Sequence, residues 1–297
     1  MVWDAEPAPT AGKHIGFCVG WLIDEKSCKK VEMKSPMGKR RLGPLTVFLL
    51  LSMAGVWARY HHRDHDLPRT LPMAVPTPVG RLHSYSTIFP VTENPLSERG
   101  KWIDGKAAGL DWTSVATVNG LAHGTESGTG RGDKSYDDSV ALLAGNWRPD
   151  QTVEARVHSV NQGDSVFEEV ELRLRSSLSA HTSTGYEVLF RCLRTPKAYA
   201  SIVRWDGPLG RFTYLDQKFG LQYGVGPGDV VKAAVVGSVI TGYVNGAPVL
   251  SATDSTFSSG SPGIGFWMQR QSGLRAWLTA SEANNTDYGF TSFAAWD

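Results

Sequence analysis

The sequence has little cysteine and no surplus of charge of either sign. Its 297 residues include 3 Cys and 30 Lys and Arg against 29 Asp and Glu, for a formal net charge of +1. Three cysteines cannot build a disulfide scaffold. The balanced charge argues against a dedicated nucleic-acid-binding protein, because such proteins draw their affinity from a basic surplus. No apolar run beyond the N-terminal region suggests several membrane spans.

Helical periodicity is also missing after residue 84. No window sustains apolar residues at i, i+3, i+4 and i+7. Short runs of Val, Ile, Tyr, Phe and Trp occur instead, separated by Gly, Pro, Asn, Asp and Ser. We therefore predict an all-β domain over 84–297, built as a two-sheet antiparallel sandwich. The expected strands are 112–118, 138–144, 151–159, 166–176, 185–193, 198–205, 211–216, 230–237, 239–244, 247–253, 263–269, 275–281 and 288–296.

The apolar run near the N-terminus, 42–58, contains no charge. Basic residues precede it and Arg59 follows it, which is the pattern of a secretory signal peptide, with cleavage expected after Ala58. An uncleaved membrane anchor is the alternative interpretation of 37–58. It is less favoured, because a membrane-spanning helix needs about 20 apolar residues and the run 42–58 is shorter. We expect the protein to be secreted, periplasmic or at the cell surface, with membrane contact only if 42–58 stays uncleaved.

The segments on either side of this run are expected to lie outside the folded domain. Met33 and Met37 are both suitable starts for a signal peptide, so we interpret 1–36 as an over-extended start of the reading frame. A short cytoplasmic tail is the alternative. Prolines recur through 59–83, and such spacing predicts an extended linker. Cys192 is then the single cysteine of the mature chain.

The strongest local signal for a hairpin is Asn245-Gly246, which stands between two apolar runs. This dipeptide supplies the positive φ angles that both central residues of a type I′ turn require. Gly237-Ser238 makes a similar break just upstream. The region 230–253 is therefore predicted to form three strands joined by tight turns.

Several motifs in the second half of the chain belong together. Three of them are strand motifs: VEARV over 153–157, VELRLRS over 170–176 and GYEVLFR over 185–191. The region 229–246 then has two expected strands, the first followed by Gly-Ser and the second by Val-Asn-Gly. Asp254 with its polar loop and GIGF over 263–266 complete the series. This series resembles the concanavalin A-like lectin/glucanase superfamily in its laminin-G-like variety, over about 100–297. The resemblance implies a jelly-roll sandwich. It does not specify a function, since this fold is found in lectins, glycosidases, lyases and adhesion modules.

Strand alternation sorts the candidate functional residues onto one face. In 170–175 the apolar residues Val170, Leu172 and Leu174 alternate with charged ones. The residues expected on the polar faces of 166–176, 185–193 and 263–269 are Glu169, Glu171, Arg173, Arg175, Glu187, Arg191, Trp267 and Gln269. If these strands are neighbours, Glu171, Arg173, Glu187, Arg191, Trp267 and Gln269 line one groove, which Trp205 extends.

Such a groove suits a carbohydrate. An indole packs against the apolar face of a sugar ring, and charged and amide groups bond its hydroxyls. We therefore predict non-catalytic binding of a polysaccharide or glycoconjugate, with stacking by Trp205 and Trp267. The residues expected to hold hydroxyls or a uronate are Glu171, Arg173, Glu187, Arg191 and Gln269. The two arginines favour an acidic sugar.

Two other functions stay open. In an enzyme, Glu171 and Glu187 would be the catalytic carboxylates of a glycoside hydrolase or polysaccharide lyase. The competing interpretation is that each Glu pairs with an Arg across strands. The E-x-D-x-E strand of the superfamily's glucanases is replaced by FEEVELR over 167–173, which argues against glucanase activity. The third possibility is a structural or adhesive surface module that binds protein.

No organic cofactor is expected. The resemblance implies calcium as a possible structural ion, because this superfamily holds calcium through loop carboxylates and backbone carbonyls. Asp254 and Asp297 are the candidate calcium ligands. A turn-capping role explains either aspartate equally well.

Overall fold

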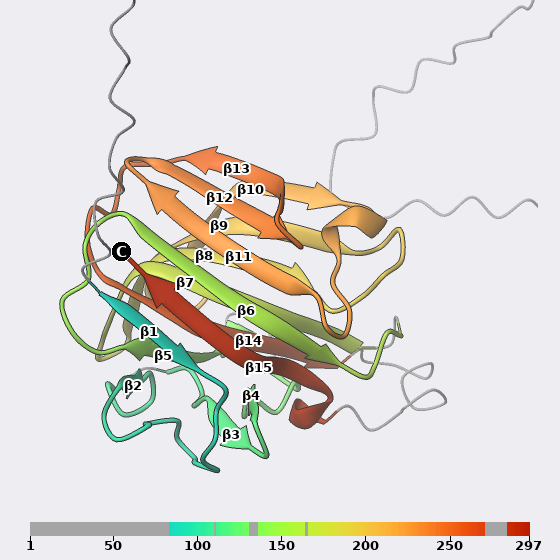
Figure 1. Ribbon diagram of the computed structural model, residues 1–297, viewed down its shortest axis with the longest axis horizontal. Helices are drawn as coiled ribbons and strands as arrows, with labels where there is room; N and C mark the ends of the chain where they lie inside the picture. The colour runs from blue at the N-terminus through green and yellow to red at the C-terminus, as the bar shows by residue number, and fades with distance from the viewer. Residues whose placement is uncertain (1–82, 110, 131–135, 164–165, 271–283) are drawn as a thin grey trace, which may run out of the picture. The chain divides into compact units, whose positions relative to one another are not determined.

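The computed structural model describes residues 83–109, 111–130, 136–163, 166–270 and 284–297. They lie in one compact unit within 74–297, and they form two antiparallel sheets packed face to face (Figure 1). Helical structure in these residues is confined to short 3-10 turns, such as Leu221–Tyr223 and Asn285–Asp287. The predicted all-β two-sheet sandwich is confirmed.

The eight-stranded sheet has the order β13-β12-β11-β6-β15-β4-β3, with β1 paired to β15. Its strands are β1 (Ser84–Thr87), β3 (Ala116–Val118), β4 (Leu121–His123), β6 (Gln151–Ser159), β11 (Val230–Val236), β12 (Val239–Val244), β13 (Ala247–Thr253) and β15 (Tyr288–Trp296). The seven-stranded sheet has the order β10-β9-β8-β7-β14-β5-β2. Its strands are β2 (Trp102–Asp104), β5 (Ser139–Leu143), β7 (Val166–Ser179), β8 (Thr182–Arg191), β9 (Tyr199–Gly207), β10 (Phe212–Phe219) and β14 (Ser261–Arg270).

Most expected strands are found within a few residues of their predicted bounds. The expected strand 112–118 is wrong in its first half, where Thr113 makes only an isolated bridge to Ser139. The strands β1, β2 and β4 were not predicted, because runs of three or four residues are too short to show an alternation. The expected strand 275–281, the signal peptide or anchor, and nearly all of the linker lie outside the described residues. Within the described residues, no helix combines the length and apolar character needed to cross a membrane.

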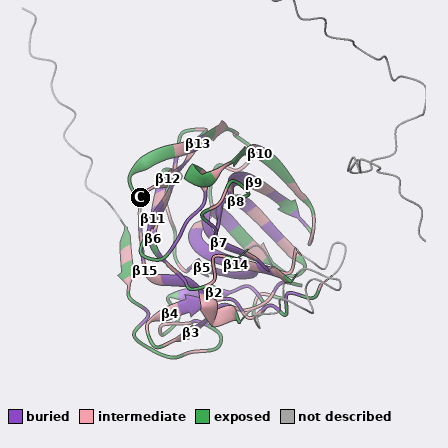
Figure 2. Cartoon of the chain, turned by 90° about the vertical axis from the view of Figure 1, so that its right-hand side faces the viewer, coloured by how far each residue is buried: buried purple, intermediate pink, exposed green. Residues whose placement is uncertain are grey.

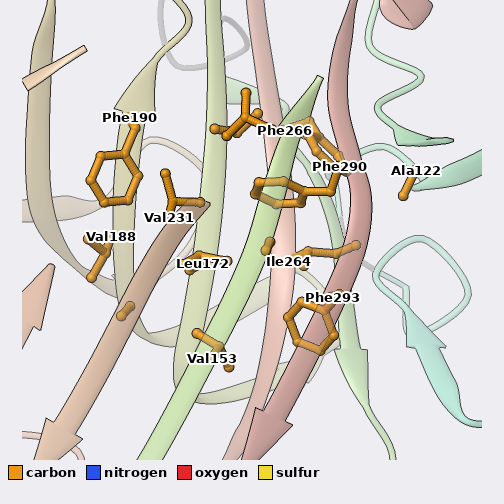
Figure 3. Packing of buried hydrophobic residues seen from close by; sticks show 14 of the residues in the cluster. Ala122, Val153, Leu172, Val188, Phe190, Val231, Ile264, Phe266, Phe290 and Phe293 are labelled. Atoms are coloured by element: carbon orange, nitrogen blue, oxygen red, sulfur yellow. The ribbon is translucent and has the colours of Figure 1, made fainter. Parts of the chain in front are cut away.

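The main core lies between the two sheets (Figure 3). On β6 the burial alternates along almost the whole strand, with Val153, Ala155 and Val157 turned inward. Figure 3 shows Phe266 and Phe290 meeting between the sheets, where their ring centroids are 5.2 Å apart. The apolar side chains that alternate with polar ones in the sequence therefore all point into one apolar layer between the sheets.

The outer face of the seven-stranded sheet is covered as well. On β7 both faces are buried, since Leu172 on one face and Arg173 on the other are 0% and 1% exposed. A second apolar cluster, which includes Trp112, Leu189 and Trp205, packs on this outer face. Figure 2 shows exposed residues gathered on the edge strands β13 and β10 and buried residues on the strands between them. Polar side chains on the outer face of the sheet centre are therefore held away from bulk water.

The predicted tight turns are present. Asn245 and Gly246 have φ of 51° and 82°, as a type I′ turn requires, and they join β12 to β13. Gly237 has φ of 56° at the turn between β11 and β12. These turns set the register of the three strands at one end of the eight-stranded sheet.

Candidate functional site

A groove of about 600 Å³ lies over the outer face of the seven-stranded sheet. Strands β7, β8, β9, β10 and β14 supply most of its lining, and the segment before β5 supplies the rest. The described lining includes four carboxylates, six aromatic side chains and two amides, namely Asp138, Glu169, Glu171, Glu187, Tyr136, Tyr199, Trp205, Phe212, Tyr214, Trp267, Gln217 and Gln269. The groove therefore combines an acidic floor with aromatic walls.

Arg173 lies at the centre of the acidic floor. Its Nη2 atom is 2.7 Å from carboxylate oxygens of both Glu171 and Glu187, and 3.1 Å from an oxygen of Asp138. All four side chains are buried. One guanidinium thus faces three carboxylates, and a buried charge cluster of this kind is held together only while each member keeps its partners.

A glycine on the neighbouring strand makes room for this cluster. Gly265 on β14 pairs with Glu171 on β7. A Cβ atom at position 265 would stand 2.2 Å from Oε2 of Glu171 and 3.1 Å from Nε of Arg173. Any side chain at this position would therefore displace the ion pair, so the glycine is needed for close approach.

Trp205 forms part of the groove wall rather than an open stacking platform. Its Nε1 donates a hydrogen bond of 2.6 Å to Glu187, and its ring packs edge-on against Trp112 at 5.5 Å between centroids. The guanidinium carbon of Arg173 lies 5.5 Å from the Trp205 ring centroid, and only 3% of Trp205 is exposed. The expectation that Trp205 presents a free face to a sugar is wrong, because Trp112 and the floor cluster cover it.

Glu169 is the fourth carboxylate of the groove. The hydroxyl of Tyr199 donates a hydrogen bond to it. Burial raises the pKa of Glu169 to about 8, and the charge of Glu187 acts in the same direction. Burial and the charge of Glu187 also raise the pKa values of Asp138 and Glu171. Glu169 therefore holds a proton near neutral pH.

Two arginines of the expected polar faces, one of which was predicted to line the groove, do not line it. Arg191 projects on the expected side of β8, but its guanidinium carbon lies 4.2 Å from the ring centroid of Phe167 and 5.6 Å from that of Tyr199. Arg175 has φ of 46° at a break in the register between β7 and β8, and it donates to the carbonyl oxygens of Pro149, Phe257 and Gly237. The bulge turns Arg175 away from the face on which alternation had placed it.

Most of the predicted site residues do come together. β7, β8 and β14 are neighbours in one sheet, as the predicted groove required. Glu171, Glu187, Trp205, Trp267 and Gln269 line the groove, and Arg173 lies beneath them. The predicted cross-strand pairing of Arg173 with Glu187 is confirmed.

The two predicted calcium ligands are separate from the groove. Asp254 accepts hydrogen bonds from Tyr186, Thr256 and Arg204. Although burial opposes ionisation, these bonds lower the pKa of Asp254 to about 2. Asp297 accepts from His83 and Arg148. The donors account for both side chains as capping groups, and calcium binding stays a prediction.

Among the described residues, one group of metal-ligand type has three side chains with oxygens within 4.8 Å of one another, namely Asp138, Glu171 and Glu187. Arg173 already stands among these oxygens and supplies a positive charge. We therefore interpret the group as an ion cluster rather than as a metal centre.

Comparisons with known proteins find structural neighbours of low similarity and no family. No family model matches the sequence, and no curated protein matches it. A carbohydrate-binding module, CBM66, from Bacillus subtilis is similar in structure, with 17% identity, coverage of 59% of this chain and 96% of that chain, and a TM-score of 0.41.

Two further structures are similar. A kappa-carrageenase from Zobellia galactanivorans is 12% identical, covers 71% of this chain and 92% of its own, and has a TM-score of 0.43. A Bacillus licheniformis beta-glucanase is 12% identical, covers 72% of this chain and 94% of its own, and has a TM-score of 0.38. These neighbours are concanavalin A-like jelly-roll proteins, the superfamily that the motifs resemble. At such TM-scores they assign no function, and the laminin-G-like variety stays a prediction.

Several groove residues were not predicted. Glu169 shares a strand face with Glu171 and Arg173, so alternation contained the signal, but its role was not assigned. Tyr214 lies on β10 near a register shift that interrupts the alternation. Asp138 is the first residue of the expected strand 138–144 and lies just before β5, but its role was not assigned, because only the folded chain brings it to Arg173.

A buried carboxyl beside the groove gives a pH-dependent prediction. Glu126 accepts hydrogen bonds from Ser139 and Tyr288, and burial raises its pKa from 4.5 to about 7. The folded state then binds more protons than the unfolded state between these two values, so stability falls as pH rises through this window. Glu126→Gln is expected to flatten that decline, at about 1.4 kcal/mol for each pKa unit.

The measurement is urea unfolding of the protein and of the Glu126→Gln variant at several pH values between about 4.5 and 8. Glu168 and Glu169, whose pKa values rise to about 7 and about 8, contribute in the same direction. The variant should therefore lose part of the slope. An unchanged slope would contradict the assignment to Glu126.

Proposed function

We propose that the protein binds a carbohydrate in this groove without cleaving it. The observation that carries the proposal is the placement of aromatic faces and hydrogen-bonding groups in one groove of about 600 Å³. Tyr214 is 53% exposed on one wall, and Trp267 and Gln269 line the groove from β14. Aromatic rings pack on the C–H faces of sugars, while amides and carboxylates bond their hydroxyls.

The floor of the groove supports binding over catalysis by the predicted carboxylates. Glu171 and Glu187 both contact Nη2 of Arg173 at 2.7 Å, and Trp205 also donates to Glu187. A glycosidase needs one carboxyl that gives up a proton and a second that is free to attack or to activate water. Two carboxylates held by one arginine are better suited to be fixed hydrogen-bond acceptors, whose orientation costs no entropy when a ligand arrives.

One observation favours a second candidate, a glycoside hydrolase. Burial raises the pKa of Glu169 to about 8, so that this carboxyl holds a proton near neutral pH. A protonated carboxyl beside a sugar is what departure of the glycosidic oxygen requires. Under this candidate Glu169 is the acid, and the role predicted for Glu171 or Glu187 as the acid falls away.

An array of neutral and charged polysaccharides tests the two candidates, with binding and release of reducing or unsaturated ends read on the same samples. We expect binding without release. Release by the protein that is lost in Glu169→Gln would establish the hydrolase and overturn the non-catalytic proposal. If no glycan binds and none is cleaved, both candidates are wrong and the structural or adhesive module is favoured.

A further inference from the structure

The charge of the groove lining is of one sign. The described residues that line it include Asp138, Glu169, Glu171 and Glu187, and none of the described lining residues is Lys or Arg. Arg173 lies beneath the floor with 1% of its surface exposed. Among the described lining residues, a ligand in the groove therefore meets acidic side chains and no basic ones.

The positive charge of Arg173 is already shared. Its Nη2 atom carries two hydrogens, and it donates them to Glu171 and Asp138 while also lying 2.7 Å from Glu187. Three carboxyl groups share one guanidinium, which leaves a surplus of acidic groups. Glu169, which holds a proton near neutral pH, adds negative charge only when a cation beside it favours its ionisation. Arg191 does not line the groove, because its guanidinium lies over the ring of Phe167, although its charge lowers the pKa of Glu169 and so favours the ionised form of that carboxyl.

This surplus has a direct consequence for the sign of the ligand. An anionic sugar would bring its carboxylate or sulfate beside the floor, and like charges placed together at an interface repel one another and weaken binding. A cation gains the attraction that the single guanidinium leaves unsatisfied. The acidic sugar expected from Arg173 and Arg191 is therefore disfavoured, since neither arginine is presented to the groove.

The aromatic wall acts in the same direction. Tyr136, Phe212 and Tyr214 form a chain of edge-to-face rings, with centroid separations of 5.0 Å and 5.3 Å. An ammonium group within about 6 Å of an aromatic face is attracted by the ring quadrupole, by roughly 0.5–1 kcal/mol at an exposed site. The wall thus suits both the apolar face of a sugar and a positively charged substituent on it.

We infer that the groove selects a glycan that carries a protonated amine, an amino sugar that is not acetylated, over uronates and sulfated sugars. The inference rests on the proposed carbohydrate binding and names the class of sugar. Glu169 is the carboxyl best placed to meet the amine, since it is 6% exposed while Glu171 and Glu187 are 1% and 2% exposed. The raised pKa of Glu169 agrees with a site that already attracts a proton.

The test compares three oligosaccharides of equal length by titration calorimetry near neutral pH, below the usual pKa of a free amino group, where the amine is still protonated. The probes are a glucosamine oligosaccharide, its fully N-acetylated counterpart and an oligogalacturonate. We expect the glucosamine oligosaccharide to bind about tenfold more tightly than the acetylated one, which corresponds to about 1.4 kcal/mol. The oligogalacturonate should bind most weakly, and added salt should reduce the preference for the amine.

Two variants locate the effect. Glu169→Gln preserves an acceptor for the hydroxyl of Tyr199 and removes the carboxyl that would ionise beside the amine, so the tenfold ratio should fall by about threefold or more. Glu154→Gln removes a carboxylate from β6, which belongs to the eight-stranded sheet and does not line the groove, and the ratio should not change.

The outcomes separate the inference from the proposed function. Equal affinity for the amine and its acetylated form, or tighter binding of oligogalacturonate, would overturn the inference and leave carbohydrate binding intact. An equal fall of the ratio in both variants would overturn it too, because the preference would then reflect general surface charge. If none of the three probes nor any glycan on the array binds, the proposed function fails with it.

Discussion

Replacement of Arg173 by Met is expected to lower the free energy of unfolding by about 3–5 kcal/mol at neutral pH. The substitution fills a similar volume but leaves Asp138, Glu171 and Glu187 without the guanidinium that lies 3.1 Å or less from each. These buried carboxyls must then take up protons or repel one another. The loss should therefore be smaller in acid than at neutral pH, and urea unfolding at both pH values measures it.

Arg204→Met is the matched control for this experiment. Arg204 forms ion pairs with Asp206 and Asp254, but its side chain is 23% exposed, and such pairs contribute about 1 kcal/mol or less. Arg173→Lys should recover part of the loss, since it restores the charge without the planar fork. A loss no larger in Arg173→Met than in Arg204→Met would show that the floor cluster contributes little to the fold.

The second large effect concerns the aromatic wall. Tyr214→Ala is expected to weaken glycan binding by about 30-fold, or about 2 kcal/mol, the size of an aromatic hot spot. Tyr214 is 53% exposed and lines the groove, so its removal takes away contact surface and leaves the main core unchanged. Titration of the protein and the variant with the tightest oligosaccharide gives the ratio directly.

Phe219 provides the control for Tyr214 because it lies on the same strand. It is 61% exposed on β10 and does not line the groove, so Phe219→Ala should bind as the wild type does. Trp267→Ala should also lose affinity, although Trp267 packs beside Phe167 at 6.2 Å and some loss of stability will accompany it. If Tyr214→Ala and Phe219→Ala bind the oligosaccharide equally well, the aromatic wall does not contact the sugar, and that part of the proposed function is wrong.

Local pattern was sufficient for the fold class and for much of the groove. Alternation on β7 separates Leu172 from Glu171, and the structure places them on opposite faces of the sheet, toward the core and toward the groove. The Asn245-Gly246 turn follows from backbone sterics at two adjacent residues. Features of this kind are predictable because their causes lie within a few residues of one another.

Tertiary structure decided the character of the site. The bulge beside Arg175 reverses the side that alternation assigns to it, and Trp112 covers Trp205, which the sequence placed on an open platform. Asp138 is 35 residues away from Arg173 in the sequence and reaches it only in the folded chain. By itself the sequence determined which side chains share a strand face, because side-chain direction has a fixed period of two. Only the folded chain decided the sign of the groove's charge, since that depends on which distant carboxylates surround Arg173 and on how deeply they are buried.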